Sequence, residues 1–90
     1  MIQQNANNPK FKVIDVRTPE EYSNGHIKGS HLVPLGDLTS RLSEFKKDEL
    51  YLMVCRSGAR SANATQILNS KGYKATNLEG GMIAWTALNH

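Results

Sequence analysis

The sequence predicts an α/β fold in which a parallel sheet carries helices on both faces. Short apolar runs that suit buried strands alternate with segments of helical periodicity, and this alternation is typical of parallel sheets. A length of 90 residues, with 39% hydrophobic and 21% charged residues, fits one small globular domain and not two. We therefore expect a single domain over residues 1–90.

The first expected strand covers residues 13–16, a short and mostly apolar run. A helix should follow it directly. Thr18 suits the N-cap, Pro19 suits the first helical position, and Glu21 completes a capping box. Gly25 lies where this short helix should end.

The middle of the chain is expected to hold a strand, a helix and the central strand. Residues 31–35 are mostly apolar, and Pro34 places them at a sheet edge or a strand end. A helix should begin at Gly36 and Asp37, because the apolar residues that follow share one face: Leu38, Leu42 and Phe45. Residues 50–54 form the most apolar run, so we expect them to be the buried central strand.

The last third of the chain repeats this alternation. Residues 61–71 have helical periodicity, and Gly72 is expected to end that helix. A further strand should follow over residues 74–78. Gly80 and Gly81 then open a last helix that carries large apolar residues: Met82, Ile83, Trp85 and Leu88.

Composition and charge exclude several functional classes. The formal charge of +3 comes from dispersed lysines, so we expect no nucleic-acid partner. Apolar runs are too short to span a membrane, and the polar start of the chain is unlike a secretory signal. We therefore expect a cytoplasmic protein. One cysteine excludes an internal disulfide and a cysteine-based zinc site, and the three histidines lack ligand spacing, so no metal or organic cofactor is expected.

The single cysteine, Cys55, lies between the central strand and a helix, where α/β proteins bind ligands. Helix N-termini attract anions, and Gly58 allows backbone N–H groups to converge in the loop. Two of the four arginines, Arg56 and Arg60, flank the thiol. These surroundings lower a thiol pKa and favour a nucleophilic thiolate beside an anionic substrate. The alternative is a small buried side chain next to solvated arginines.

Four segments of the chain together carry a resemblance to a known family. They are DVRTPEEY at 15–22, GHIKGS at 25–30, CRSGARS at 55–61 and LEGGMIAW at 78–85. In this order and spacing the chain resembles the rhodanese-like family in its small single-domain form. The resemblance implies a three-layer domain and a sulfurtransferase. Cys55 would attack the outer sulfur of thiosulfate, release sulfite and hold a persulfide, which a thiol or cyanide acceptor would then discharge.

The resemblance also assigns roles to individual residues. Cys55 is the expected nucleophile. The persulfide would be cradled by the loop residues that follow it: Arg56, Ser57, Gly58, Ala59, Arg60 and Ser61. Arg56 would attract an anionic donor, and Arg60 is the second anion-binding candidate. Asp15 and Arg17 are expected to pair at a neighbouring strand end and brace the site; the alternative is a purely structural ion pair. Structural roles are expected for both internal histidines, His26 and His31.

Two other functions share this arrangement of residues. Cysteine phosphatases and arsenate reductases also place a Cys and an Arg on an anion-binding loop, but with five intervening residues. Four separate Cys55 from Arg60, and a shorter loop suits one sulfur atom better than a tetrahedral oxyanion. The remaining alternative is a non-enzymatic module that carries sulfur or docks on a partner.

The chain departs from the family at its start. Only twelve residues precede Val13, so residues 1–12 are interpreted as a shortened lead-in that lacks the family's N-terminal strand. We therefore expect four strands, with five as the alternative, and an uncovered edge along residues 74–78. The expected partners are a small anionic sulfur donor and a thiol or protein sulfur acceptor, and the expected oligomeric state is a monomer or weak dimer.

Overall fold

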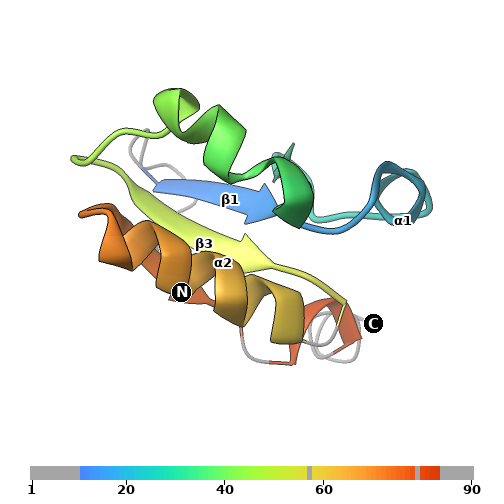
Figure 1. Ribbon diagram of the computed structural model, residues 1–90. Helices are drawn as coiled ribbons and strands as arrows, with labels where there is room; N and C mark the ends of the chain where they lie inside the picture. Colours follow the sequence, from blue (N-terminus) through green and yellow to red (C-terminus); the bar gives the residue numbers. More distant parts are fainter. Residues whose placement is uncertain (1–10, 57, 79, 84–90) are drawn as a thin grey trace.

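The computed structural model describes residues 11–56, 58–78 and 80–83, and these form one parallel four-stranded sheet (Figure 1). The strands lie in the order β2-β1-β3-β4. Their bounds are β1 Phe11–Asp15, β2 His31–Leu32, β3 Leu50–Val54 and β4 Lys74–Asn77. The predicted α/β class with four parallel strands is confirmed. Within the described ranges no strand pairs with the outer edge of β4; the expected uncovered edge stays a prediction, because residues 1–10 lie outside these ranges.

The two central strands bury side chains on both faces of the sheet. β1 and β3 pair over their full length, from Phe11 opposite Leu50 to Asp15 opposite Val54. Successive side chains of a strand point to opposite faces, so two apolar clusters form. The larger cluster includes Ile14, Val16, Val33, Leu38, Phe45, Tyr51, Met53, Cys55, Ala64 and Leu68. The smaller includes Val13, Ile27, Leu52 and Val54, with Met82 packed against them.

Helix α2, Ala59–Ser70, covers the larger cluster with Ala64 and Leu68. It begins two residues before the expected start at residue 61. On the other face, Met82 packs from the helical residues 81–83. The rest of the expected last helix, with Trp85 and Leu88, lies outside the described residues, as does most of the expected lead-in.

Helix α1, Pro19–Ser23, has the predicted capping box. The Thr18 hydroxyl accepts a 3.2 Å hydrogen bond from the Glu21 N–H. The Glu21 carboxylate in turn accepts a 3.1 Å bond from the Thr18 N–H. Asn24, one residue before the expected Gly25, is the C-cap.

The prediction of one helix from Gly36 is wrong, and so is the full extent of the strand at 31–35. The chain pairs with β1 only at His31–Leu32 and then forms two 3₁₀ helices, η1 Leu35–Asp37 and η2 Thr39–Glu44. Arg41 has non-helical dihedrals, φ −110° and ψ 16°. Its guanidinium donates hydrogen bonds to Glu44 and to the Leu32 carbonyl. The non-helical dihedrals of Arg41 interrupt what would otherwise be a regular helix. The apolar residues at this spacing still pack into the core, since Leu38 and Phe45 are buried.

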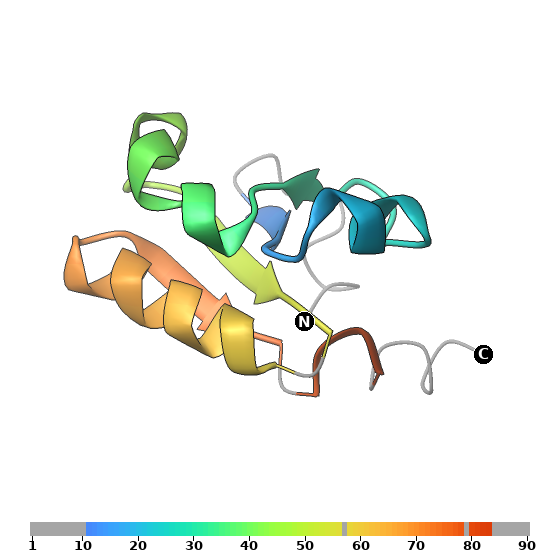
Figure 2. The same cartoon turned by 45° about the vertical axis from the view of Figure 1, so that its right-hand side comes forward.

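The functional end of the domain is where the carboxyl ends of the strands meet. In both ribbon views, α1, the start of α2 and the turn at residues 80–83 gather at the end toward which β1 and β3 point (Figures 1 and 2). Across the described residues, no helix is both long and apolar enough to cross a membrane.

Candidate active site

The cysteine predicted to be the nucleophile, Cys55, directly follows β3 and is 1% exposed. Its Sγ accepts a hydrogen bond of 2.9 Å from the backbone N–H of Gly58. Gly58 is the N-cap of α2, so the amino end of that helix lies at the sulfur. A helix N-terminus and a backbone N–H aimed at one atom favour negative charge there, such as that of a thiolate or a persulfide.

Gly58 has a backbone conformation that the loop requires. Its φ is +103°, in the left-handed region that side chains rarely adopt. A Cβ built on it would lie 3.2 Å from the Gly80 nitrogen and 3.6 Å from the Leu78 carbonyl oxygen. The absence of a side chain therefore lets the loop turn its N–H toward Cys55 while the backbone atoms of Leu78 and Gly80 lie close to it.

A second glycine, Gly81, closes the helical turn onto the cysteine loop. The Met82 N–H donates to the Cys55 carbonyl at 2.8 Å, and the Ile83 N–H donates to the Arg56 carbonyl at 3.0 Å. A Cβ on Gly81 would collide with the Cys55 carbonyl oxygen and lie 2.6 Å from that of Arg56. Only glycine allows this approach, which fixes the backbone on both sides of the Cys55–Arg56 peptide bond.

The side chain of Ser61, in the first turn of α2, is fully buried beside the thiol. Its Oγ lies 3.3 Å from Cys55 Sγ and also bonds to Oδ1 of Asn77. The Asn77 amide nitrogen in turn donates to the Gly58 carbonyl at 3.2 Å. Asn77 ends β4, so this strand contributes a polar side chain to the loop.

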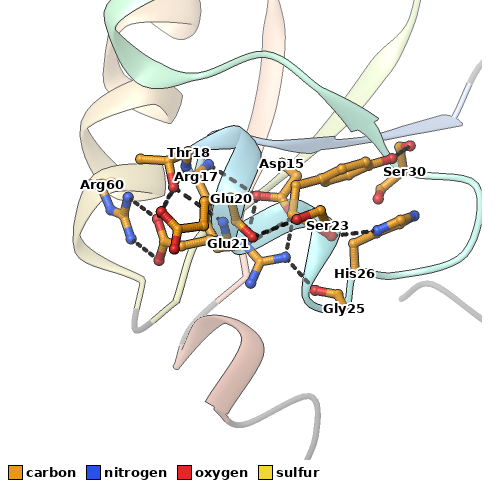
Figure 3. A network of polar contacts seen from close by, with 11 residues as sticks. Asp15, Arg17, Thr18, Glu20, Glu21, Ser23, Gly25, His26, Ser30 and Arg60 are labelled. Atoms are coloured by element: carbon orange, nitrogen blue, oxygen red, sulfur yellow. Dashed lines mark hydrogen bonds and ion pairs between the residues drawn. The ribbon is translucent and has the colours of Figure 1, made fainter.

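Arg60 is held by a carboxylate from the other side of the site (Figure 3). Its Nη1 and Nη2 donate to Glu21 Oε1 and Oε2 at 2.7 and 2.8 Å. These hydrogen bonds, together with the bond from the Thr18 N–H, lower the pKa of Glu21 from 4.5 to about 2, and they raise the pKa of Arg60. The pair ties α1 to α2, and it neutralises much of the positive charge that the sequence placed at this end of the loop.

Asp15 and Arg17 form the predicted pair at the end of β1 (Figure 3). They are 1% and 6% exposed. The Arg17 Nε donates to Asp15 Oδ1 at 2.9 Å, and Nη2 donates to Oδ2 at 2.7 Å. Nη2 also donates to the Gly25 carbonyl at 2.8 Å. Asp15 is opposite Val54, one residue before Cys55, so the pair fixes the strand end and the chain around α1 next to the cysteine.

Comparison with known proteins agrees with this arrangement. The model of the rhodanese-like domain matches residues 1–88 of the chain. This chain belongs to the rhodanese-like family. By family it is a sulfurtransferase.

Relatives of this rhodanese-like domain are similar over most of its length. A candidate sulfurtransferase of Bacillus subtilis, YtwF, is 41% identical over 73 residues, which cover 81% of this chain and 71% of that protein. A sulfurtransferase of Allochromatium vinosum is 39% identical over 84 residues, which cover 92% of this chain and 78% of that protein. The crystal structure of a rhodanese-like domain protein from Staphylococcus aureus has a TM-score of 0.86 at 38% identity, covering 93% of this chain and 83% of that one.

The remaining residues of the rhodanese-like loop divide by exposure. Arg56 is exposed, and among the described residues its side chain has no hydrogen-bond or ion-pair partner. It is therefore available to meet an anion. Ala59 is the exposed first residue of α2. Ser57, which is also an expected cradle residue, lies outside the described residues.

Three site residues escaped prediction from the sequence. Glu21 was explained completely by the capping box, and its bond to Arg60 spans 39 positions. Asn77 lies one residue before the end of the strand expected over 74–78, and an asparagine near a carboxyl end beside the cysteine strand is a usable signal. Gly81 was interpreted as a helix start, and its close approach to Cys55 depends on tertiary packing.

The described residues give His26 a structural contact. Its ring stacks on Tyr22 with 3.7 Å between centroids, and its Nδ1 lies 2.8 Å from the Tyr22 carbonyl oxygen. His31 is exposed in β2. Within the described ranges, no group of three or more His, Cys, Asp or Glu side chains is placed to hold a metal ion.

Proposed function

We propose that this rhodanese-like domain transfers sulfane sulfur from thiosulfate, or a related anionic donor, to a thiol or cyanide acceptor through a persulfide on Cys55. The observation that carries the proposal is the Gly58 N–H, which donates to Cys55 Sγ at 2.9 Å at the start of α2. This donor stabilises the Cys55 thiolate, which attacks in the first half-reaction and leaves in the second, so one arrangement serves both half-reactions.

Each half-reaction exchanges one bond for another. The Cys55 thiolate attacks the outer sulfur of thiosulfate, a new sulfur–sulfur bond forms, and sulfite leaves with the electron pair of the old one. An acceptor thiolate then attacks the terminal sulfur, which breaks the persulfide bond and restores the Cys55 thiolate. With cyanide as acceptor, the product is thiocyanate. No electrons are needed from outside, because the transferred sulfur keeps its oxidation state overall.

Arg56 is the cation that attracts the donor in this proposal. Its exposure supports this role, and the neighbouring Arg60 is already bound by Glu21. The bond to Glu21 also weighs against a phosphatase, since that chemistry requires the loop arginine to hold the oxyanion. In cells, a small thiol or a protein thiol is the acceptor we propose.

The test is the intact mass of the protein after incubation with thiosulfate. The wild type should gain the mass of one sulfur atom and lose it again on addition of cyanide, with thiocyanate formed. Cys55→Ser is the matched control and should show neither change. An unmodified wild-type mass would refute the proposal. Repeated turnover supports an enzyme, whereas a stable persulfide that only a protein partner discharges supports the carrier alternative.

A further inference from the structure

The buried hydroxyl of Ser61 lies within hydrogen-bond distance of three acceptors, although it can donate only one proton. Its Oγ is 3.3 Å from Cys55 Sγ and 3.3 Å from the Gly58 carbonyl oxygen, and it also bonds to Asn77 Oδ1. A hydroxyl has one proton to donate. Ser61 is 0% exposed, so this proton is distributed among groups of the protein.

The orientation of the Asn77 amide is set by its second contact. Its Nδ2 donates to the Gly58 carbonyl oxygen at 3.2 Å, and a carbonyl oxygen only accepts. The NH₂ group therefore faces Gly58, and the amide oxygen faces Ser61. Asn77 thus presents a fixed acceptor to the same hydroxyl that lies beside the thiol.

The hydroxyl proton must move when the cysteine ionises. With a neutral thiol, Ser61 donates to Asn77 and its oxygen accepts from the S–H of Cys55. With a thiolate, the hydroxyl must rotate to donate to the sulfur, and the bond to Asn77 is lost. We propose that Asn77 is a positioning residue that competes with the Cys55 sulfur for the Ser61 proton and so sets the pH at which Cys55 becomes nucleophilic. The proposal rests on the proposed function only for the role of Cys55.

Charged groups nearby act on the thiol independently of Asn77. They come from β1, α1, α2 and the loop: the pair Asp15–Arg17, the pair Glu21–Arg60, and Arg56. The described contacts of these five side chains include neither the asparagine nor the serine. Substitution of Asn77 therefore leaves these charges in place, and the part of any change in thiol ionisation that requires the Ser61 hydroxyl reports its proton.

Two substitutions of Asn77 should shift ionisation in opposite directions. Asn77→Leu keeps the branched shape and the number of side-chain heavy atoms but removes the competing acceptor, so the Ser61 hydroxyl remains on the sulfur and the thiol ionises about one pH unit lower. Asn77→Asp offers the hydroxyl a stronger acceptor and adds a negative charge near the sulfur, so the thiol ionises about one pH unit higher. In both variants the Gly58 carbonyl keeps its bond from the Ala62 N–H at 3.0 Å.

The experiment is the rate of Cys55 alkylation by iodoacetamide as a function of pH. Ser61→Ala should raise the midpoint, and in that background Asn77→Leu should have no further effect. Asn69→Leu is the matched control, because Asn69 also bonds β4, at the Ala75 backbone, but has no described contact with the cysteine loop. Its midpoint should equal that of the wild type. Urea unfolding would verify that each variant is folded. If Asn77→Leu is insoluble, Asn77→Ala takes its place.

The outcomes separate this inference from the proposed function. A downward shift for Asn77→Leu that vanishes without the Ser61 hydroxyl, together with an upward shift for Asn77→Asp that becomes smaller without it, supports the inference, since general loosening of the loop would not depend on that hydroxyl. An unchanged midpoint, or equal shifts with and without the hydroxyl, would overturn it. Alkylation requires no sulfur donor, so the predicted shifts in the variants, together with a wild type that gains no sulfur from thiosulfate, would refute the proposed function alone.

Discussion

The Glu21–Arg60 pair allows a quantitative test of how the site is held together, through the substitution Glu21→Gln. The carboxylate of Glu21 accepts from the Thr18 N–H at 3.1 Å and from both Nη atoms of Arg60 at 2.7 and 2.8 Å. Glutamine also serves in a capping box. The substitution therefore keeps the cap of α1 and removes mainly the charge that binds Arg60.

The expected loss of stability follows from the pKa of Glu21, which its partners lower from 4.5 to about 2. At about 1.4 kcal/mol for each pH unit, this difference sets an upper limit of about 3.5 kcal/mol. The two side chains are 29% and 37% exposed, so water screens the pair, and we expect about 1 kcal/mol at neutral pH.

The pH dependence of this loss has a defined direction. The pKa of Glu21 is lower in the folded state than in the unfolded state, so the stabilisation is complete above pH 4.5 and disappears as the pH falls toward 2. Glu21→Gln lacks this contribution at every pH. The difference in unfolding free energy between wild type and variant should therefore shrink to nearly zero at about pH 2.

Urea unfolding followed by circular dichroism at several pH values measures this difference. Glu44→Gln is a matched control, because Glu44 pairs locally with Arg41 in an exposed position, and its effect should be smaller. A double-mutant cycle with Arg60→Met isolates the pairwise energy. A difference that does not vary between pH 7 and pH 2, or a cycle with no coupling between Glu21 and Arg60, would refute the reasoning.

Three further predictions concern the loop and its support. Arg56→Ala should raise the KM for thiosulfate several-fold and leave the urea midpoint within error, because the side chain is exposed; an unchanged KM would remove Arg56 from donor binding. Asp15→Asn should lower the unfolding free energy by about 3 kcal/mol, since it leaves the buried Arg17 unpaired; calorimetry would contradict this if Tm stayed the same. Gly81→Ala should slow persulfide formation in stopped-flow mixing with thiosulfate, because its Cβ would displace the Cys55 carbonyl, whereas a wild-type rate would show that the turn does not position the loop.

Much of the fold could be predicted because local signals and tertiary packing agree along most of the chain. The apolar run of β3, the capping box of α1 and the body of α2 all depend on neighbouring residues. At residues 35–44 the two disagree. The periodicity there favoured one helix, but the chain forms two 3₁₀ helices, and within the second Arg41 leaves helical dihedrals and bonds to the Leu32 carbonyl.

The site divides in the same way. That Cys55 stands at a strand end before a helix, with arginines on either side of the loop, follows from residues adjacent in the chain. Which of the two arginine side chains remains available to an anion does not follow from adjacent residues. Arg56 and Arg60 look equivalent in the sequence, and only the approach of α1 brings Glu21 onto Arg60 and leaves Arg56 exposed.

By itself, therefore, the sequence determined the position of the proposed nucleophile Cys55, the strand before it and the helix after it, because these depend on spacing within a few residues. Tertiary structure decided the partners of those groups. Glu21 on Arg60, Asn77 on Ser61 and the Gly81 turn on the Cys55 carbonyl all join segments distant in sequence. Such contacts depend on how strands are ordered in the sheet, since the order β2-β1-β3-β4 alone brings these segments to one end of the domain.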